Sequence, residues 1–556
     1  MVTPGSKQLG AVGTPGPNWQ ASEAGTWGYD SRLNLNGYRP TPIDTLPTCP
    51  VPGADGYYGT IASTSNNPGA QALRSLTVGG DVTGGYVIMV PKLSWYDKSF
   101  VRGLQEEWFT RLAAIPDAVL GPDLSKIGKS DDAALLDVWA RIHGCVSESE
   151  PKRLVRAVYY EPNELKIEMD KMLIEHRDSI RVMCHTWGTK PIMEGNEVRG
   201  VIFESKEGRK AVYAKTVIDA TGDGDIFRYS GAPYSTLADG KTRSSTTALV
   251  WRIGGMNWDV FTEWKNSHPK TAAELARNLS KIAGFRCSPI ASSRNDICWV
   301  NNWHANKDCS NIRDITQTEI ETRDTMRDVL EYLREACPVA FRNAYLYDIA
   351  PQLGSRCSFR LQGEYIMTAN DFAFAPEFDD VIAWHSTICM INDCGPVEIP
   401  YRAILPRNVE NLLCPGRHIS ADDVAIDWLT LIPQCIGTGQ AAGVAAAVSR
   451  ILASEGRTQA SITIDQATLG GEVVSNLTAV LEHAEGRLNV KSLSAALPGG
   501  ARLAASGAFD GPRTDLRYSG RIALRGASMA RFATWVAHDS ELVLPTRDGP
   551  FTLVGD

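Results

Sequence analysis

Two short glycine-bearing stretches carry the residues that could hold a charged or flat ligand. Residues 216–227, TVIDATGDGDIF, run from an apolar segment into a turn that contains Asp223 and Asp225. A strand ending in a glycine turn often holds a phosphate, but two carboxylates would repel one. In the second stretch, IGTGQAAGVAAAV, Gly437 and Gly439 are predicted to open a helix whose free N–H groups carry partial positive charge. Taken alone, each stretch also fits an ordinary turn or a close helix–strand contact.

Histidine and arginine side chains are the candidates for moving a proton and for holding an anionic substrate. A histidine can carry a proton near neutral pH, and an arginine can bind a carboxylate through two N–H groups. The candidates are His304, His385, His418, Arg356 and Arg360. For each histidine the alternative is a packed or surface side chain, and for each arginine it is a structural ion pair.

Recognisable secondary-structure patterns flank these stretches. Three strand-like segments, residues 180–193, 197–205 and 211–220, are separated by the short turns EGN and KEGR, which predicts an antiparallel meander. The last of these strands leads directly into the first glycine stretch. Residues 409–423, VENLLCPGRHISADD, predict a buried strand followed by a glycine turn. Beyond about residue 455, alternating segments predict a strand-rich appendage.

The composition of the whole chain bounds its class. The 556 residues are 43% hydrophobic and 22% charged, which is typical of a globular protein with two or three domains. A net charge of −8 without a basic block argues against nucleic acid as a partner. No apolar run reaches the length of a membrane span and no secretory pattern is visible, so we expect a cytoplasmic protein. The 12 cysteines form no C-x-x-C pair, and no metal site is expected.

The order of these stretches resembles the FAD-dependent oxidoreductases of the glutathione-reductase-like fold, close to fumarate-reductase-type flavoproteins. The resemblance covers about residues 79–454 and rests on PNELKIEMDKMLIE, VIFESKEGRKAVYAKTVIDATGDGDIF, APQLGSRCSFRLQGEYIMT, IPYRAILP, NLLCPGRHIS and GTGQAAG. It implies an α/β fold with an α+β insertion. The expected components are an FAD-binding domain, with a βαβ core and an antiparallel meander, and a substrate or cap domain.

The resemblance also implies a division of the chain. The expected regions are an irregular or degenerate N-terminal segment (1–78), the first segment of the FAD-binding domain (79–231), an inserted substrate domain (232–400), the second segment of the FAD-binding domain (401–455) and a C-terminal extension (456–556). The family opens with a strand–GxGxxG–helix unit that binds the dinucleotide. Here that unit is degenerate, because Gly56 and Gly59 give only G-x-x-G and Ala54 stands at the first glycine.

The cofactor contacts that the resemblance implies fall on three segments. They are Ala220, Thr221 and Gly222 beside the ADP half, Gly416 and Arg417 along the pyrophosphate and ribityl chain, and Thr438, Gly439, Gln440 and Ala441 at the pyrimidine edge of the flavin. The helix start at the third segment would stabilise negative charge on the reduced flavin. Asp223 and Asp225 would point away from phosphate, toward turn amides or a helix start.

The reacting residues that the resemblance implies come from the inserted domain and from the GRHIS turn. His304 and His385 belong to the domain expected to cover the flavin, and His418 would run along it. Arg356 and Arg360 lie in GSRCSFRLQGEY, which resembles an arginine-bearing segment of the family, although Cys357 and Phe359 replace its usual acid and second arginine.

Two functions from different classes fit this sequence. The first is FAD-dependent transfer of a hydride between a small organic substrate and the flavin, which the preserved small residues on the flavin side favour. The alternative is a non-catalytic scaffold relic or binding protein that has lost FAD, which the degenerate N-terminal unit favours. A small molecule is the expected partner in the first case.

Overall fold

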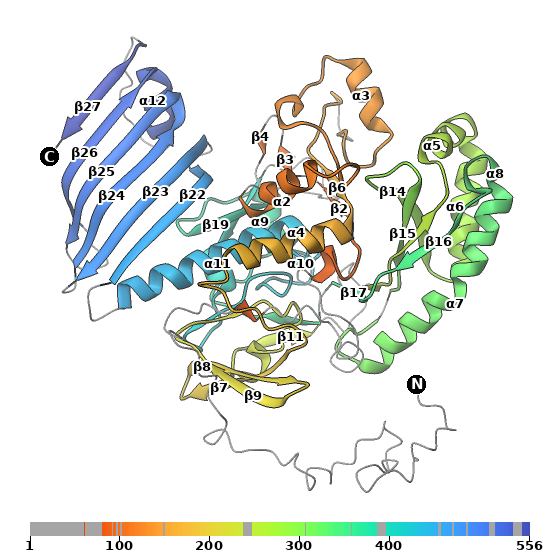
Figure 1. Ribbon diagram of the computed structural model, residues 1–556, viewed down its shortest axis with the longest axis horizontal. Coiled ribbons are helices and arrows are strands. Elements are labelled where there is room, and N and C mark those ends of the chain that lie inside the picture. Colours follow the sequence, from red (N-terminus) through yellow and green to blue (C-terminus); the bar gives the residue numbers. More distant parts are fainter. Residues whose placement is uncertain are drawn as a thin grey trace, which may run out of the picture.

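The computed structural model of this chain describes residues 60–61 and 80–555, with gaps at 92, 96–97, 100–102, 148–150, 237–246, 306, 357, 386–395, 454–457, 470–471, 485–486, 511–516 and 538–547. The degenerate dinucleotide-binding unit, with Ala54, Gly56 and Gly59, therefore lies outside the described residues. Figure 1 shows a strand-rich sheet at the C-terminal end, a helix-covered sheet on the opposite side, and the long helix α11 (Ile432–Ala453) between them.

The strands that precede the two predicted glycine turns are neighbours in a small parallel sheet. Strand β10 (Val217–Asp219) lies between β1 (Thr60–Ile61) and β21 (Leu412–Leu413). Val217 pairs with Leu412, and Ile218 pairs with Leu413. Because parallel strands end at the same edge of a sheet, the loops that follow β10 and β21 meet there. Ile218 and Leu413 share a hydrophobic core with Ala442 of α11, which fixes the helix against the sheet.

The predicted antiparallel meander is confirmed, with strands β7 (Trp187–Glu194), β8 (Glu197–Ser205) and β9 (Gly208–Tyr213). The predicted start of its first strand, at residue 180, is wrong, because β7 begins at Trp187 and residues 180–186 form no strand. The predicted last strand, residues 211–220, is wrong as a single element. Strand β9 ends at Tyr213, and β10 begins at Val217 in a different sheet. The amide of Ala214 still donates to Arg199 of β8, whereas the amide of Val217 donates to Asn411. The chain therefore changes hydrogen-bond partners between the two strands.

The segment before the meander forms a second small sheet with two helices. Its strands are β2 (Met89–Val90), β6 (Val158–Tyr160) and β5 (Val119–Leu120), and its helices are α2 (Leu104–Ala113) and α4 (Pro162–Glu175). Leu165 and Met169 of α4, one turn apart, pack with Trp108 and Leu112 of α2 in one core. The hairpin β3 (Ser94–Trp95) and β4 (Lys98–Ser99) and the helix α3 (Ala133–Ala140) complete this region.

The region from about residue 247 to 350 contains a four-stranded antiparallel sheet covered by helices. The strand order is β14 (Arg286–Ala291), β15 (Ile297–Trp303), β13 (Trp251–Gly254) and β16 (Tyr345–Ile349). The helices are α5 (Trp258–Ser267), α6 (Pro269–Ala283), α7 (Ile312–Ala336) and α8 (Pro338–Phe341). Their shared core extends to Tyr86 and Tyr159, so this sheet packs directly against the preceding segment. Below, this four-stranded sheet is called the cap sheet.

Three two-stranded antiparallel sheets complete this part of the chain. They are β11 (Tyr234–Thr236) with β18 (Phe359–Leu361), β12 (Thr247–Ala248) with β17 (Gly354–Ser355), and β19 (Val381–His385) with β20 (Val397–Pro400). Helices α9 (Ala369–Phe374) and α10 (Ile426–Leu429) lie in the same region. Met367, Phe372 and Ile399 pack with Ile218 and Leu413. The end of the predicted inserted domain therefore shares its core with the parallel sheet.

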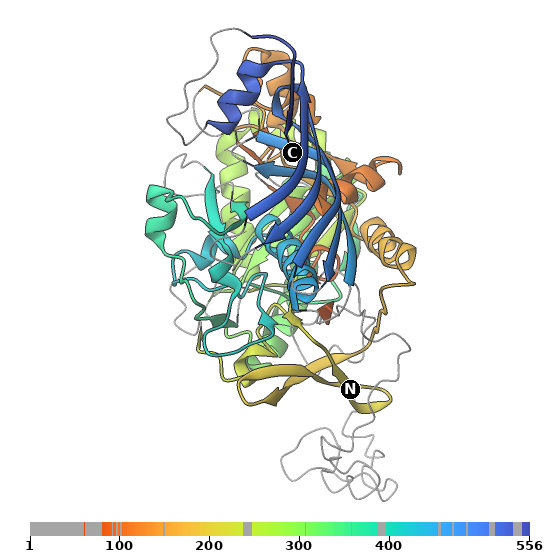
Figure 2. The same ribbon diagram turned by 90° about the vertical axis from the view of Figure 1, so that its left-hand side faces the viewer.

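The C-terminal appendage is an antiparallel sheet in sequence order. Its strands are β22 (Thr458–Leu469), β23 (Glu472–Ala484), β24 (Arg487–Leu497), β25 (Ala501–Asp510), β26 (Arg517–Gly526) and β27 (Phe551–Gly555). Helix α12 (Met529–Val536) packs on it through Phe532 and Phe551. Figure 2 shows this sheet edge-on in front of the rest of the molecule. Among the residues that the structure describes, no helix is long and apolar enough to cross a bilayer.

Candidate functional site

The predicted cofactor residues come from the loop after β10, the loop after β21 and helix α11. The amide of Gly416, in the loop after β21, donates a 3.1 Å hydrogen bond to the hydroxyl of Thr438 on α11. Arg417, from the same loop, reaches the loop after β10, where it binds Asp223. The structure thus brings together three segments that are far apart in the sequence.

The turn after β10 is shaped by the carboxylate of Asp219. One of its oxygens accepts hydrogen bonds from the amide and the hydroxyl of Thr221, and the other accepts from the amides of Ile226 and Phe227. The expectation that Asp223 and Asp225 bind the turn amides is therefore wrong, because Asp219 already satisfies these N–H groups. Asp219, the last residue of β10, thus holds the following turn closed through side-chain hydrogen bonds to its backbone, as Asp does in many turns.

Asp223 instead forms a buried ion pair with Arg417. The Nη2 atom of Arg417 lies 3.0 Å from the Oδ2 atom of Asp223, and both side chains are almost completely buried. Ser358 donates a 2.8 Å hydrogen bond to Asp223, and Nη2 of Arg417 donates a 3.1 Å hydrogen bond to Ser355. The sequence did not identify the two serines as site residues. Both lie in GSRCSFRLQGEY, whose arginines were considered instead.

Gly222 is required by this ion pair. Its φ of 80° is in the left-handed region, which favours glycine. A Cβ atom at this position would overlap the guanidinium group of Arg417. Arg417 therefore fills the space beside Gly222, and a cofactor at this turn would meet the half-buried Ala220 before it meets Gly222.

Asp225 is a buried carboxyl group with little positive charge around it. Burial raises the pKa of Asp225 from 3.8 to about 7, and the nearby carboxylate of Asp223 adds to the rise. Arg228 is its ion-pair partner at 3.4 Å, which only partly offsets the burial. In the folded chain Asp225 therefore keeps its proton at mildly acidic pH and loses it only near pH 7.

Replacing Asp225 with asparagine is expected to make stability less dependent on pH. Below about pH 4 the carboxyl group is protonated in both the folded and the unfolded chain. Between about pH 4 and 7 the unfolded chain loses this proton while the folded chain keeps it, so the free energy of unfolding falls as pH rises. The stability gain of Asp225→Asn over the parent should be about 2 kcal/mol larger at pH 8 than at pH 5.

Urea unfolding at the two pH values measures this difference. Asp170→Asn, at an exposed position of α4, serves as the control and should show no such difference. Equal effects of Asp225→Asn at pH 5 and pH 8 would contradict the raised pKa of Asp225.

His418 lies behind the turn. Its Nε2 atom donates a 3.0 Å hydrogen bond to the carbonyl oxygen of Asp219, and the edge of its ring packs on Phe227. The side chain is fully buried, and burial lowers the pKa of His418. The neutral ring thus helps to hold the turn in place, and its role in proton transfer stays a prediction.

The other predicted reacting residues are not gathered at one point. Arg360 forms an ion pair with Asp423 and donates to Ser235, and Arg356 donates a 3.4 Å hydrogen bond to Thr430. Both arginines thus have intramolecular partners in this structure. The side chain of His385 lies outside the described residues.

His304 is a packed histidine. Its Nε2 atom lies 2.8 Å from the hydroxyl of Thr322, and its ring centroid lies 3.8 Å from that of Phe285. Burial and the charge of Lys307 lower the pKa of His304 to about 4, so the ring is neutral at physiological pH. Its expected role as a general base stays a prediction.

The prediction that Gly437 and Gly439 open a helix is wrong, because α11 begins at Ile432. Pro433 occupies the first turn, where a missing N–H loses no hydrogen bond. Residues 437–441 therefore lie in the second and third turns, and their amides are inside the helix. The side chain of Gln440 accepts a 3.3 Å hydrogen bond from the amide of Leu104, so Gln440 anchors the start of α2.

Two glycines leave open space where a flat ligand could approach. A Cβ atom built at Gly416 or at Gly439 meets no heavy atom of the described residues within 4 Å. The half-buried Ala441 follows on α11, and the buried Thr438 joins the helix to the Gly416 loop. These residues fit a bound FAD, because they leave the backbone accessible next to a rigid helix. The opening at the Gly416 loop and α11 is called the glycine face below.

The loops after β10 and β21 and helix α11 all fall within a region that matches a known protein family. A family model described as FAD dependent oxidoreductase matches residues 73–469. No curated protein matches this chain.

Several solved structures are distantly similar to the chain. A geranylgeranyl bacteriochlorophyll reductase-like protein from Thermoplasma acidophilum has a TM-score of 0.28 and 13% identity, over 55% of this chain and 57% of that chain. A triple mutant of a flavin-dependent brominase has a TM-score of 0.30 and 12% identity, over 55% and 62%. The glycerol-3-phosphate dehydrogenase from Bacillus halodurans, complexed with FAD, has a TM-score of 0.22 and 12% identity, over 49% and 51%. The chain thus matches between about half and three fifths of the length of these proteins.

Proposed function

Because this chain belongs to the FAD-dependent oxidoreductase family, we propose that it oxidises or reduces a small organic molecule with FAD held at the glycine face. Flavin-dependent redox chemistry is the activity of the family, and FAD is its cofactor. The observation that carries the proposal for this chain is the glycine face itself. Gly416 and Gly439 are open to a ligand, while Thr438 ties the two segments together.

In this proposal the chain's own residues bind and orient the cofactor. Gly416 and Arg417 would lie along the pyrophosphate and ribityl chain, and Thr438, Gly439 and Ala441 would lie at the edge of the ring. The Asp223–Arg417 ion pair holds the Arg417 loop at a fixed position, because both partners are buried and hydrogen-bonded to serines. The chemistry that FAD supplies when bound is transfer of a hydride between a substrate carbon and the flavin.

The fold type, the domain boundaries and the reacting residues in this proposal are taken from the same family resemblance. The fold is of the glutathione-reductase-like type, with residues 79–231 and 401–455 as the two segments of the FAD-binding domain and residues 232–400 as the substrate domain. The C-terminal extension begins at residue 456. A proton would be carried by His418, His304 or His385, and Arg356 or Arg360 would bind a substrate carboxylate once released from its present partner. The expected location is the cytoplasm.

The spectrum of the purified protein tests the proposal. The protein should carry a flavin absorbance band, or gain a bound one after incubation with FAD and gel filtration. Loss of all flavin on gel filtration after such incubation would support the alternative, a scaffold that has lost FAD.

A further inference from the structure

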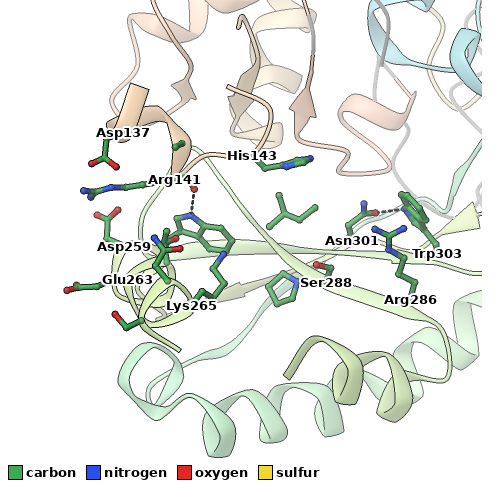
Figure 3. A pocket seen from close by; sticks show the side chains of 17 residues that line it. Asp137, Arg141, His143, Asp259, Glu263, Lys265, Arg286, Ser288, Asn301 and Trp303 are labelled. Atoms are coloured by element: carbon green, nitrogen blue, oxygen red, sulfur yellow. Dashed lines mark hydrogen bonds between the residues drawn. The ribbon is translucent and has the colours of Figure 1, made fainter. Parts of the chain in front are cut away.

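A large polar cavity lies away from the glycine face, between the α3 segment and the cap sheet (Figure 3). Its volume is about 890 Å³, and none of its lining residues belongs to the proposed cofactor contacts. On one side it is lined by Arg141 and His143, which follow α3. On the other side it is lined by α5 and by the strands β14 and β15. Residues from two regions of the chain therefore form one cavity.

One residue that lines the cavity carries a buried hydroxyl group with no hydrogen-bond partner among the described residues. Thr262 of α5 lines the cavity, and only 6% of its surface is exposed. Its Oγ1 atom is buried and forms no hydrogen bond there. Such a group typically costs about 1–3 kcal/mol, and buried hydroxyls are almost always satisfied. A ligand atom in the cavity would supply the missing partner once the Thr262 side chain rotates toward it.

A half-buried cation lies three residues further along the same helix. The ammonium group of Lys265 lies 4.8 Å from the ring centroid of Trp258 and 4.7 Å from that of Phe261. Within the described ranges, no carboxylate forms an ion pair with Lys265. Burial lowers the pKa of Lys265, because the aromatic rings replace part of the water around its ammonium group. An oxyanion beside this ammonium group would restore that solvation.

The two ends of the cavity carry different charged side chains. Arg286 stacks over the ring of Trp303 at 4.1 Å, at the end of the cavity formed by β14 and β15. Asp259 and Glu263 stand at the opposite end in Figure 3, beside Asp137 and Arg141, and Lys265 lies between the two ends. The cavity therefore offers the cations Lys265 and Arg286 to one portion of a ligand, and carboxylate acceptors together with Arg141 to the other. A ligand with an anionic group and several hydroxyl groups matches both ends. The indole rings of Trp258 and Trp303, which also line the cavity, can pack against its apolar faces.

We propose that this cavity binds a small polyhydroxylated organic anion, with its carboxylate or phosphate at Thr262 and Lys265 and its hydroxyl groups toward Asp259 and Glu263. The proposal goes beyond the redox function, because it depends only on residues of the cavity. Carboxylate and phosphate share the required chemistry, and separate probes distinguish them.

Isothermal titration calorimetry of the full-length protein tests the proposal with three probes of similar size. Gluconate carries a carboxylate, glucose 6-phosphate carries a phosphate, and glucose is neutral. At least one of the two anions should show saturable binding, and it should bind more tightly than glucose. Absence of saturable binding of both anions up to about 10 mM, which corresponds to an affinity too weak for a specific site, would overturn the proposal.

Two variants locate the binding in this cavity. Lys265→Met keeps most of the length of the side chain but removes its charge, and it should weaken anion binding by about tenfold or more. Lys281→Met, at an exposed position of α6 outside the cavity, should bind as the parent does. If Lys265→Met binds the anion as tightly as the parent, the site is elsewhere and the proposal is wrong.

Thr262→Val separates a ligand contact from a structural role. Valine has the same shape but no hydroxyl group, so the ligand-free variant should have an unchanged or higher Tm. Anion binding should nevertheless weaken severalfold. A lowered Tm with unchanged binding would show that the hydroxyl serves the fold, not a ligand. These experiments measure ligand binding and Tm only. Their outcome is therefore independent of the redox proposal, which the flavin spectrum tests.

Discussion

Replacing Arg252 with methionine is expected to lower the free energy of unfolding by about 3–5 kcal/mol. Arg252 lies on β13 and is fully buried. Its Nη1 atom lies 2.7 Å from Glu161, and its Nη2 atom lies 2.6 Å from Asp348. Without the guanidinium group, two carboxylates would share one enclosed site with no cation between them.

The location of Arg252 explains why the effect should be large. Glu161 caps the start of α4, whereas Asp348 belongs to β16 of the cap sheet. Arg252 therefore joins the cap sheet to the segment before the meander. The centroids of the Tyr86 and Tyr347 rings each lie 4.9 Å from its guanidinium carbon, so aromatic faces also contact the cation.

Urea unfolding of Arg252→Met beside a matched surface variant measures this contribution. Arg294 forms a pair with Asp296 at 3.0 Å, but both side chains are largely exposed. Arg294→Met should therefore cost less than about 1 kcal/mol. A triple variant, Arg252→Met with Glu161→Gln and Asp348→Asn, should recover most of the lost stability. If Arg252→Met costs no more than the surface variant, the buried pair does not stabilise the fold.

Replacing Gly439 with glutamate is expected to abolish FAD retention without unfolding the chain. A Cβ atom at Gly439 meets no described atom within 4 Å, so the longer side chain can extend into the open space of the glycine face. In the proposed complex that space is filled by the flavin edge. The glutamate would then bring both bulk and an unpaired negative charge against the ring, and FAD affinity should fall by more than about tenfold.

The ratio of flavin to protein absorbance after gel filtration measures retention, and Tm reports folding. Val444→Glu places the same side chain on α11, at a position that is already 42% exposed, and should keep its flavin. Gly439→Ala adds only a methyl group to open space and should retain most of it. A Gly439→Glu protein that holds FAD as the parent does would place the cofactor elsewhere. A lowered Tm without flavin loss would point to packing of α11 instead.

Local patterns in the sequence were sufficient to predict the main helices and strands, but not all the residues at which they begin and end. The meander and the strand-rich appendage were predicted because alternating side chains and glycine turns are short-range signals. The single strand 211–220 was wrong because its two halves bind different neighbours, β8 and β21. The predicted helix start at Gly437 was wrong because α11 begins at Ile432. Pro433 marks that start, because proline is favoured in the first turn of a helix.

The family was also recognisable from the sequence, because it rests on the order of short motifs, and the family model over residues 73–469 confirms it. The partners of the buried ion pairs were not recognisable from the sequence. Asp223 binds Arg417 across 194 residues, and Arg252 binds Glu161 and Asp348 across 91 and 96 residues. Nothing in the local sequence of these residues distinguishes a buried ion pair from a solvated charge.

The sequence by itself was enough to place this chain in the FAD-dependent oxidoreductase family, through the order of its short motifs. Tertiary structure alone decided which charges are buried, which carboxylate shapes the turn after β10, and that Thr262 and Lys265 face a shared cavity. The physical reason is that motifs depend on backbone conformation, which neighbouring residues set. Burial, pKa and unsatisfied hydrogen bonds depend on which distant segments pack together, and only the folded chain fixes that.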